Sequence, residues 1–355
     1  MRPSCLEVLE PRVMLAGDVV AVVTAAGDLL ITGDKSDNNI AISADLGGGI
    51  AITPGDANTT INGADVAAVL NGWTGKILLR MGDGKDTVQI TGVNVAGDVR
   101  FDGGRGDNTL TLDSTIVTGQ LRVKNLMGRQ ELSLLNASSV GSVDMVNAQK
   151  GDTTTVIENS TVVGRLKLNN KDGADSLTLT AAQIGDVKVD NHKGNSNVTI
   201  EACTINGNLW LKSTHGQDSV DILNATVIGG TMKLATGDKG ADINLAALTV
   251  GALDIQTGKG SDQLTLDSVA VTGTTKIKTD KGRDTITVSN GMVAPAGFGG
   301  SVNIDAGQDD DQMDIAAAFA AAVKVSGNKG DDSLNWLATS TFVIEPQTIQ
   351  VETIT

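Results

Sequence analysis

Short apolar segments recur along the chain at a nearly constant spacing. In one series a glycine precedes a segment in which apolar and polar residues alternate, as in Val99-Arg100-Phe101 and Leu166-Lys167-Leu168. Alternation with a period of two predicts a β-strand with one buried and one exposed face. These glycines lie 21 to 23 residues apart: Gly75, Gly97, Gly119, Gly141, Gly164, Gly185, Gly207, Gly229, Gly251 and Gly273. The chain therefore contains a tandem repeat of about 22 residues.

Two further apolar series keep the same period. A second strand begins at Val88, Leu110, Leu132, Val156, Leu177, Val198, Val220, Ile243, Leu264, Ile286, Met313 and Leu334. A third inward position precedes the glycine, at Val95, Val117, Val140, Ile184, Ile205, Val250 and Val271. Equivalent strands at constant spacing pair most simply in parallel, with antiparallel hairpins as the alternative. We predict an all-β, single-domain, right-handed parallel β-helix (β-solenoid) with three short strands per coil.

The repeat extends over most of the chain, with no linker that would divide it. We assign residues 17–355 to the β-helix, with about 13 to 14 coils. Segments 29–31, 40–42, 50–52 and 61–63 are apolar but irregular, and we interpret them as degenerate coils.

Outward positions of the two strand series differ in chemistry. On the glycine-led strand they form a mostly basic stripe: Arg100, Arg122, Asp144, Lys167, Lys188, Trp210, Lys233, Asp254, Lys276, Asn303 and Lys324. On the second strand many are hydroxyl residues, which suit an exposed pleated surface: Thr111, Ser133, Thr178, Thr199, Thr265 and Thr287. Interruptions at Gln89, Ile157, Asp221 and Asn244 argue against a flat threonine face for ice or crystals.

Composition narrows the classes of partner. The formal net charge is −15, which argues against nucleic-acid binding. No stretch approaches the ~20 apolar residues of a membrane span. The two cysteines, Cys5 and Cys203, are far apart and do not indicate a disulfide framework. The only histidines, His192 and His215, fall in turns of adjacent coils without a third ligand in phase.

A glycine turn between the strands carries an aspartate two residues after the glycine. The G-x-D pairs begin at Gly84, Gly173, Gly216, Gly240, Gly260, Gly282 and Gly330. The simplest role is structural, because glycine permits positive φ and aspartate accepts hydrogen bonds from turn amides. Carboxylates stacked at strand spacing also repel one another, and Ca²⁺ would remove that repulsion.

The turn at residues 103–110, GGRGDNTL, resembles the calcium-binding nonapeptide of RTX proteins. It departs from the RTX pattern at Asn108, and its period is 22 residues. The resemblance implies Ca²⁺ as a candidate ligand, and the strongest acidic cluster for it comprises Asp309, Asp310, Asp311, Asp331 and Asp332.

A polysaccharide-acting enzyme of the pectate-lyase type is the main alternative function. Arg100, Arg122 and Asp144 follow one another on the basic stripe, as such a site requires. Trp210 is the single aromatic residue on that face, and no familiar hydrolase, metal or nucleotide motif is present. The sequence therefore predicts neither catalytic nor cofactor-binding residues.

The N-terminus stands outside the repeat. Its segment Leu9-Glu10-Pro11-Arg12-Val13-Met14-Leu15 resembles the LEPR-XLL motif of large exported and surface proteins of planctomycete-type bacteria. The resemblance covers residues 1–16 and implies a secreted or cell-surface protein. We expect a non-enzymatic structural or adhesive solenoid. Its expected partners are envelope polysaccharide, or further copies of the chain in end-to-end fibres. A calcium-stabilised surface binding protein is an alternative.

Overall fold

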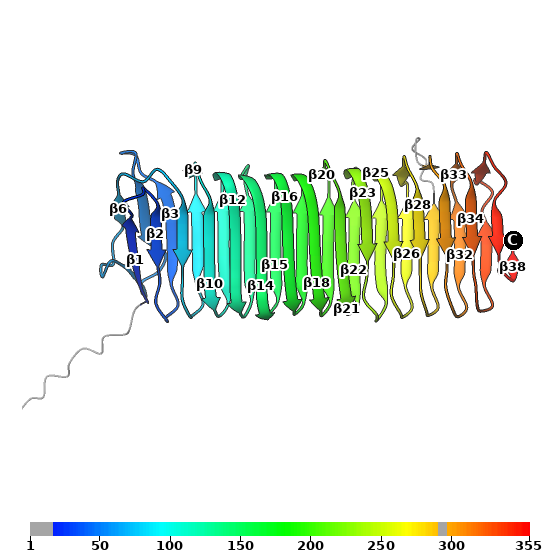
Figure 1. Cartoon of the computed structure of the whole chain (residues 1–355), viewed down its shortest axis with the longest axis horizontal. Helices are drawn as coiled ribbons and strands as arrows, with labels where there is room; N and C mark the ends of the chain where they lie inside the picture. Colours follow the sequence, from blue (N-terminus) through cyan, green and yellow to red (C-terminus); the bar gives the residue numbers. More distant parts are fainter. Residues whose placement is uncertain (1–16, 290–296) are drawn as a thin grey trace, which may run out of the picture.

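The computed structural model describes residues 17–289 and 297–355, which form a long rod of stacked β-coils (Figure 1). Coils of about 22 residues stack in parallel, as the repeat predicts, but the rod has about 12 turns where 13 to 14 were expected. Within the described ranges, no helix could cross a membrane. The LEPR-XLL-like segment at 1–16 lies outside the described residues.

One side of the rod is a 16-stranded sheet in which all pairings are parallel except the two antiparallel pairings of β4 (Ile50–Pro54). Its parallel strands are β3 (Asn39–Ala44), β8 (Thr87–Thr91), β11 (Asn108–Asp113), β13 (Gln130–Leu135), β15 (Thr153–Glu158), β17 (Asp175–Thr180), β19 (Ser196–Glu201), β22 (Asp218–Leu223), β24 (Ala241–Ala246), β26 (Gln263–Asp267), β29 (Thr285–Ser289), β32 (Gln312–Ala316), β35 (Ser333–Trp336) and β38 (Thr353–Ile354).

The glycine-led strands belong to a second, 22-stranded sheet. They are β2 (Leu29–Thr32), β7 (Ile77–Arg80), β10 (Val99–Arg105), β12 (Ile116–Met127), β14 (Ser139–Lys150), β16 (Thr161–Asp172), β18 (Gln183–Lys193), β21 (Leu209–His215), β23 (Val227–Ala235), β25 (Thr249–Gln256), β28 (Thr275–Lys278), β31 (Val302–Asp305), β34 (Val323–Ser326) and β37 (Gln347–Ile349).

The third side of each coil is short. It is a separate strand in β9 (Asn94–Val95), β20 (Thr204–Ile205), β27 (Ala270–Val271), β30 (Gly297–Phe298), β33 (Ala318–Phe319) and β36 (Thr341–Phe342). In β12, β14, β16, β18, β23 and β25 the strand instead runs through the glycine into the long side. An ideal Cβ on Gly185 would lie 2.3 Å from the carbonyl oxygen of Gly164, so close coil stacking requires glycine here.

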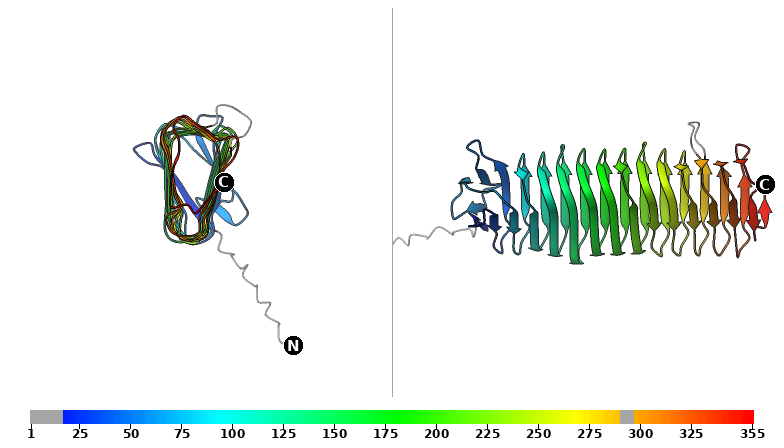
Figure 2. Two further views of the ribbon diagram at one scale, coloured as in Figure 1. Left: turned by 90° about the vertical axis from the view of Figure 1, so that its right-hand side faces the viewer. Right: turned by 45° about the horizontal axis from the view of Figure 1, so that its top comes forward.

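Each side contributes apolar side chains to one continuous core. In the coil of β11 and β12, Leu110, Leu112, Leu121 and Val123 are fully buried and Val117 is nearly so. Viewed along the rod, the coils superimpose on one elongated outline (Figure 2, left). The predicted three-sided coil is thus confirmed.

The N-terminal end differs from the predicted row of degenerate coils. Segments 29–31 and 40–42 do form a first parallel coil, since β2 pairs with β7 and β3 with β8. Strand β4 (Ile50–Pro54) instead folds back antiparallel on β3, and β6 (Ala68–Leu70) antiparallel on β4. Strand β1 (Gly17–Val23) pairs antiparallel with β2 and parallel with β5 (Thr59–Ile61). These strands bury apolar residues over the end of the core, so the prediction was wrong for 50–52 and 61–63.

One coil is shifted by a residue from the prediction. Thr155 and Ile157 point inward in β15 and Val156 points outward, because they pair in register with Leu177, Leu179 and Thr178 of β17. Val156, and not Ile157, therefore interrupts the hydroxyl ladder. Elsewhere the ladder pairs as predicted, for example Thr178 with Thr199 and Thr265 with Thr287.

A residue with positive φ ends many strands of the 16-stranded sheet. Asparagine takes this position at Asn136, Asn159 and Asn224, but alanine takes it at Ala181, with φ of 48°. The left-handed conformation disfavours a Cβ, and asparagine tolerates it better than alanine does.

Replacing the exposed Ala181 with asparagine should therefore stabilise the protein by roughly 0.5–1 kcal/mol. Denaturant unfolding would measure the gain. Ala174→Asn, at an exposed turn alanine outside the positive-φ positions, is the matched control. Equal gains from both variants would contradict the backbone explanation.

Candidate functional site

The basic stripe is a row of directly paired residues on the glycine-led strands. Arg100 pairs with Arg122, Arg122 with Asp144, and Asp144 with Lys167. The row continues through Lys188, Trp210, Lys233, Asp254, Lys276, Asn303 and Lys324. The structure thus brings together the stripe that the sequence predicts.

Ion pairs along the stripe run between coils. Asp144 lies 3.8 Å from the Arg122 guanidinium and 3.4 Å from the Lys167 ammonium group. Lys188 Nζ lies 4.1 Å from the ring centre of Trp210, a cation–π contact. Exposed ion pairs of this kind contribute little stability and leave the cations accessible. The stripe can therefore bind anionic groups.

A shallow hollow lies at the N-terminal part of the stripe. It has a volume of about 210 Å³ and is lined by Leu78, Leu79, Arg80, Arg100, Phe101, Asp102, Arg122 and Lys124. Four of these side chains are cationic and one is anionic. The hollow is therefore complementary in charge to an anionic group.

The glycine turns hold a second row, of inward aspartates that join neighbouring coils. Asp284 Oδ1 accepts the backbone N–H of Asp262 at 2.9 Å, and Asp311 Oδ1 accepts that of Asp284 at 2.9 Å. Asp332 continues the row by accepting the Asp311 N–H at 3.0 Å. Asp86 does the same for Asn38 at 3.1 Å. The structural role expected for the G-x-D aspartates is thus present at these turns.

Burial of these carboxyl groups raises their pKa. Desolvation raises the pKa of Asp86 to about 7, against hydrogen bonds from Asn38 that lower it. Desolvation likewise raises the pKa of Asp175 to about 7 and of Asp311 to about 8. Without a bound cation, these carboxyl groups are therefore still partly protonated near neutral pH.

Asp242 departs from the other G-x-D aspartates. Ala241 pairs with Asp218 in the register, so Ala241 takes the inner position and Asp242 is exposed. Conversely, Asp311 takes an inner position although no glycine lies two residues before it. The motif alone therefore identifies the inner row imperfectly.

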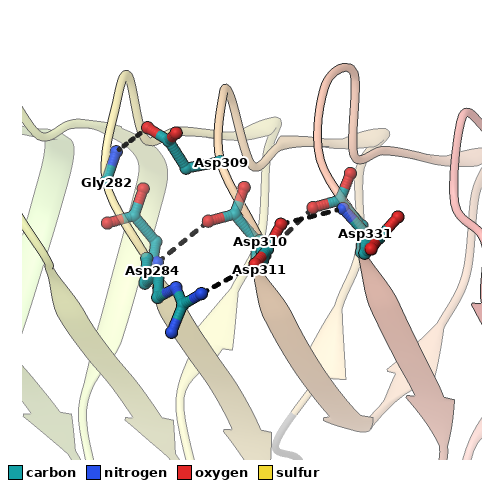
Figure 3. A network of polar contacts seen from close by, with 8 residues as sticks. Gly282, Asp284, Asp309, Asp310, Asp311 and Asp331 are labelled. Carbon is teal, nitrogen blue, oxygen red and sulfur yellow. Dashed lines mark hydrogen bonds and ion pairs between the residues drawn. The ribbon is translucent and has the colours of Figure 1, made fainter.

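Of the predicted calcium residues, three lie on the outside of the turns (Figure 3). Asp309 Oδ2 accepts the Gly282 N–H at 3.2 Å, and Asp310 bonds the Arg283 guanidinium at 2.9 Å and the Asp331 N–H at 3.1 Å. The backbone hydrogen bond from Asp331, together with Arg283, lowers the pKa of Asp310. Within 17–289 and 297–355, no three His, Cys, Asp or Glu side chains gather in a group suited to a metal.

The two histidines are offset by one residue in the coil. Lys193, and not His192, pairs with His215. His215 Nδ1 lies 3.1 Å from Asp238 Oδ2 of the next coil. The pair is an exposed inter-coil contact. Cys203 is buried and free, at the small inward position that the sequence indicates, and Cys5 lies outside the described residues.

A row of buried asparagines inside the coils, the asparagine ladder, was not predicted from the sequence. Asn125, Asn147, Asn170 and Asn191 pair in register and are buried. Asn125 Nδ2 donates to the carbonyl oxygen of Gly128 at 3.1 Å, and Asn170 Nδ2 donates to Asn191 Oδ1 at 2.9 Å. The signal was an asparagine at one fixed position in four successive glycine-led strands.

A polar groove follows the same turns on the outside. It has a volume of about 540 Å³, and its lining includes Asp152, Ser176, Asn197, Gln217 and Asp242. Several of its polar side chains are committed to backbone, since Asp152 accepts the Ala174 N–H at 2.8 Å and Asn195 accepts the Gln217 N–H at 3.0 Å. The groove is therefore a weaker candidate for ligand binding than the basic stripe.

No family model, no curated protein and no solved structure matches this chain. The candidate site is therefore assigned from its geometry.

Proposed function

We propose that this protein is a non-enzymatic structural or adhesive solenoid of the bacterial cell surface, which contacts envelope polysaccharide through its basic stripe. The observation that carries the proposal is the unbroken register of the stripe over successive coils, from Arg100 to Lys324. Cations that recur along most of this row suit a polymer with repeated negative charges better than a single small molecule.

The location of the native protein tests the surface assignment. We expect an antibody to label intact cells, or to detect the protein in spent medium. Labelling confined to the interior of lysed cells would contradict it. End-to-end assembly into fibres stays a separate prediction, which electron microscopy of the purified protein would test.

Removing the cations of the hollow should weaken binding to an acidic polysaccharide. We expect the double variant Arg100→Gln/Arg122→Gln to lower the affinity about tenfold, or about 1.4 kcal/mol. Lys85→Gln/Lys281→Gln removes two exposed cations from turns outside the stripe and is the matched control. Calorimetry with soluble polysaccharide would measure both, and an equal loss in the control would contradict a role for the stripe.

The adjacency of Arg100, Arg122 and Asp144 favours a polysaccharide-cleaving enzyme as the second candidate. Chromatography of the polysaccharide after incubation separates the two functions. A structural or adhesive protein leaves the chain length unchanged. Shortening that disappears in the Arg100→Gln/Arg122→Gln variant would favour the enzyme.

A further inference from the structure

The turn of Asn108 shows what surrounds a side chain in the row of inward aspartates. Asn108 Oδ1 accepts the Asp86 N–H at 3.0 Å, which is the bond that the inner aspartates make. Its other atom, Nδ2, donates to the carbonyl oxygens of Gly103 at 2.9 Å and Gly106 at 3.2 Å. The second polar atom of this position therefore lies among hydrogen-bond acceptors.

Asp311 and Asp332 place an oxygen where Asn108 has its amide nitrogen. In both, Oδ1 accepts the N–H of the preceding coil, while Oδ2 is buried and without a partner. The two residues are only 2 % and 0 % exposed. An ideal Cβ on Gly327 would lie 2.2 Å from Asp332 Oδ2, just as one on Gly103 would lie 2.7 Å from Asn108 Nδ2. When the carboxyl group is ionised, an acceptor thus replaces a donor at the same place.

Electrostatic repulsion between the stacked carboxylates adds to the cost of this arrangement. Asp284, Asp311 and Asp332 occupy successive rungs, about 4.8 Å apart at strand spacing. Asp309 and Glu352 add negative charge nearby, and Arg283 bonds Asp310 on the outside of the turn. Buried like charges without a partner are costly.

We propose that the inner positions of Asp311 and Asp332 form an inter-coil site for a divalent cation, with Ca²⁺ as the expected ion. The ligands are the Oδ2 atoms, turn carbonyls and water, an all-oxygen set of the kind that Ca²⁺ takes. Because each coil supplies one carboxylate and main-chain oxygens, acidic side chains need not cluster. The site is independent of the proposed surface function.

The proposal separates the inner aspartates from the outer ones. Asp310 is satisfied by Arg283 and a backbone amide, so it needs no cation. Asp311→Asn should reproduce the turn of Asn108, with an amide that donates to turn carbonyls. This variant should keep the fold and lose the cation response.

The experiment uses EDTA-treated protein at pH 8. We expect millimolar CaCl₂ to raise the Tm of the wild type by about 3 °C or more, and calorimetry to show calcium binding. Asp311→Asn should lose the calcium-induced shift and bind calcium at least about tenfold more weakly. Asp310→Asn is the matched control and should keep both responses.

Each other outcome overturns the proposal. A wild-type Tm that ignores calcium, together with no binding heat, removes the site. Loss of the response in Asp310→Asn but not in Asp311→Asn moves it to the outer carboxylates. If Asp311→Asn does not fold, Asp332→Asn takes its place in the Tm comparison, and equilibrium dialysis measures calcium binding to the wild type. Wild-type protein that retains no calcium in dialysis would overturn the proposal.

Discussion

Raising the pH from about 4 to about 8 is expected to lower the free energy of unfolding by about 4 kcal/mol for each of two buried carboxyl groups, Asp86 and Asp175. Both have an ordinary pKa of 3.8 that burial raises to about 7 in the folded protein. The folded state therefore holds these protons more tightly than the unfolded chain does. Their stabilisation is complete below the unfolded pKa and is lost as the pH rises through the folded pKa.

The groups around each carboxyl support this direction. Asp34 and Asp37 face Asp86 and further raise its pKa, whereas two hydrogen bonds from Asn38 oppose the shift. Asp86 Oδ2 is buried without a partner, so ionisation would place negative charge on an oxygen that accepts no hydrogen bond. Asp152 raises the pKa of Asp175, against hydrogen bonds from Thr153.

Urea unfolding across this pH range would measure the effect. Asp86→Asn should remove the contribution of Asp86 to the pH dependence of the free energy of unfolding. Asparagine already occupies the equivalent position at Asn108 without a charge. Asp242→Asn is the matched control, since Asp242 has the same G-x-D spacing but is exposed. General repulsion in a chain of charge −15 would affect both variants alike. Equal pH curves for wild type and Asp86→Asn would contradict the explanation.

The coil could be predicted because its period is carried by many residues at once. Gly97, Val99 and Phe101 and their equivalents recur with the same spacing, and each inward position found this way is buried. The two-residue period of a strand does not decide, however, which of two adjacent apolar residues faces the core. In the segment 153–157, TTTVI, both Val156 and Ile157 are apolar, and only pairing with Leu177 and Leu179 decides which one faces the core.

The ends and the turns were less predictable for a different reason. Segments 50–52 and 61–63 have the alternation of a strand, but alternation does not tell a parallel coil from a hairpin over the end of the core. Likewise, the spacing of G-x-D does not show whether a turn has slipped by one residue, as it has at Asp242. These outcomes depend on contacts with the neighbouring coil.

Replacing Phe319 with alanine is expected to destabilise the C-terminal coils by about 5 kcal/mol. Phe298, Phe319 and Phe342 occupy equivalent positions in three successive coils, with ring centres 5.3 and 5.2 Å apart. Trp336 packs edge-on against Phe342 at 4.9 Å. Phe319 is 3 % exposed, so its removal leaves a cavity in the middle of the stack.

Because each coil of a solenoid contacts only its neighbours, the loss should be local. Hydrogen exchange should accelerate in β31, β34 and β37 and stay slow in β13, β15 and β17. Phe298→Leu and Phe319→Leu, singly and together, measure the ring stacking, with an expected coupling of about 1 kcal/mol. Phe101→Leu is the control, since its neighbours in register are Leu79 and Val123. No coupling between Phe298 and Phe319 would mean that burial alone, without stacking, stabilises these coils.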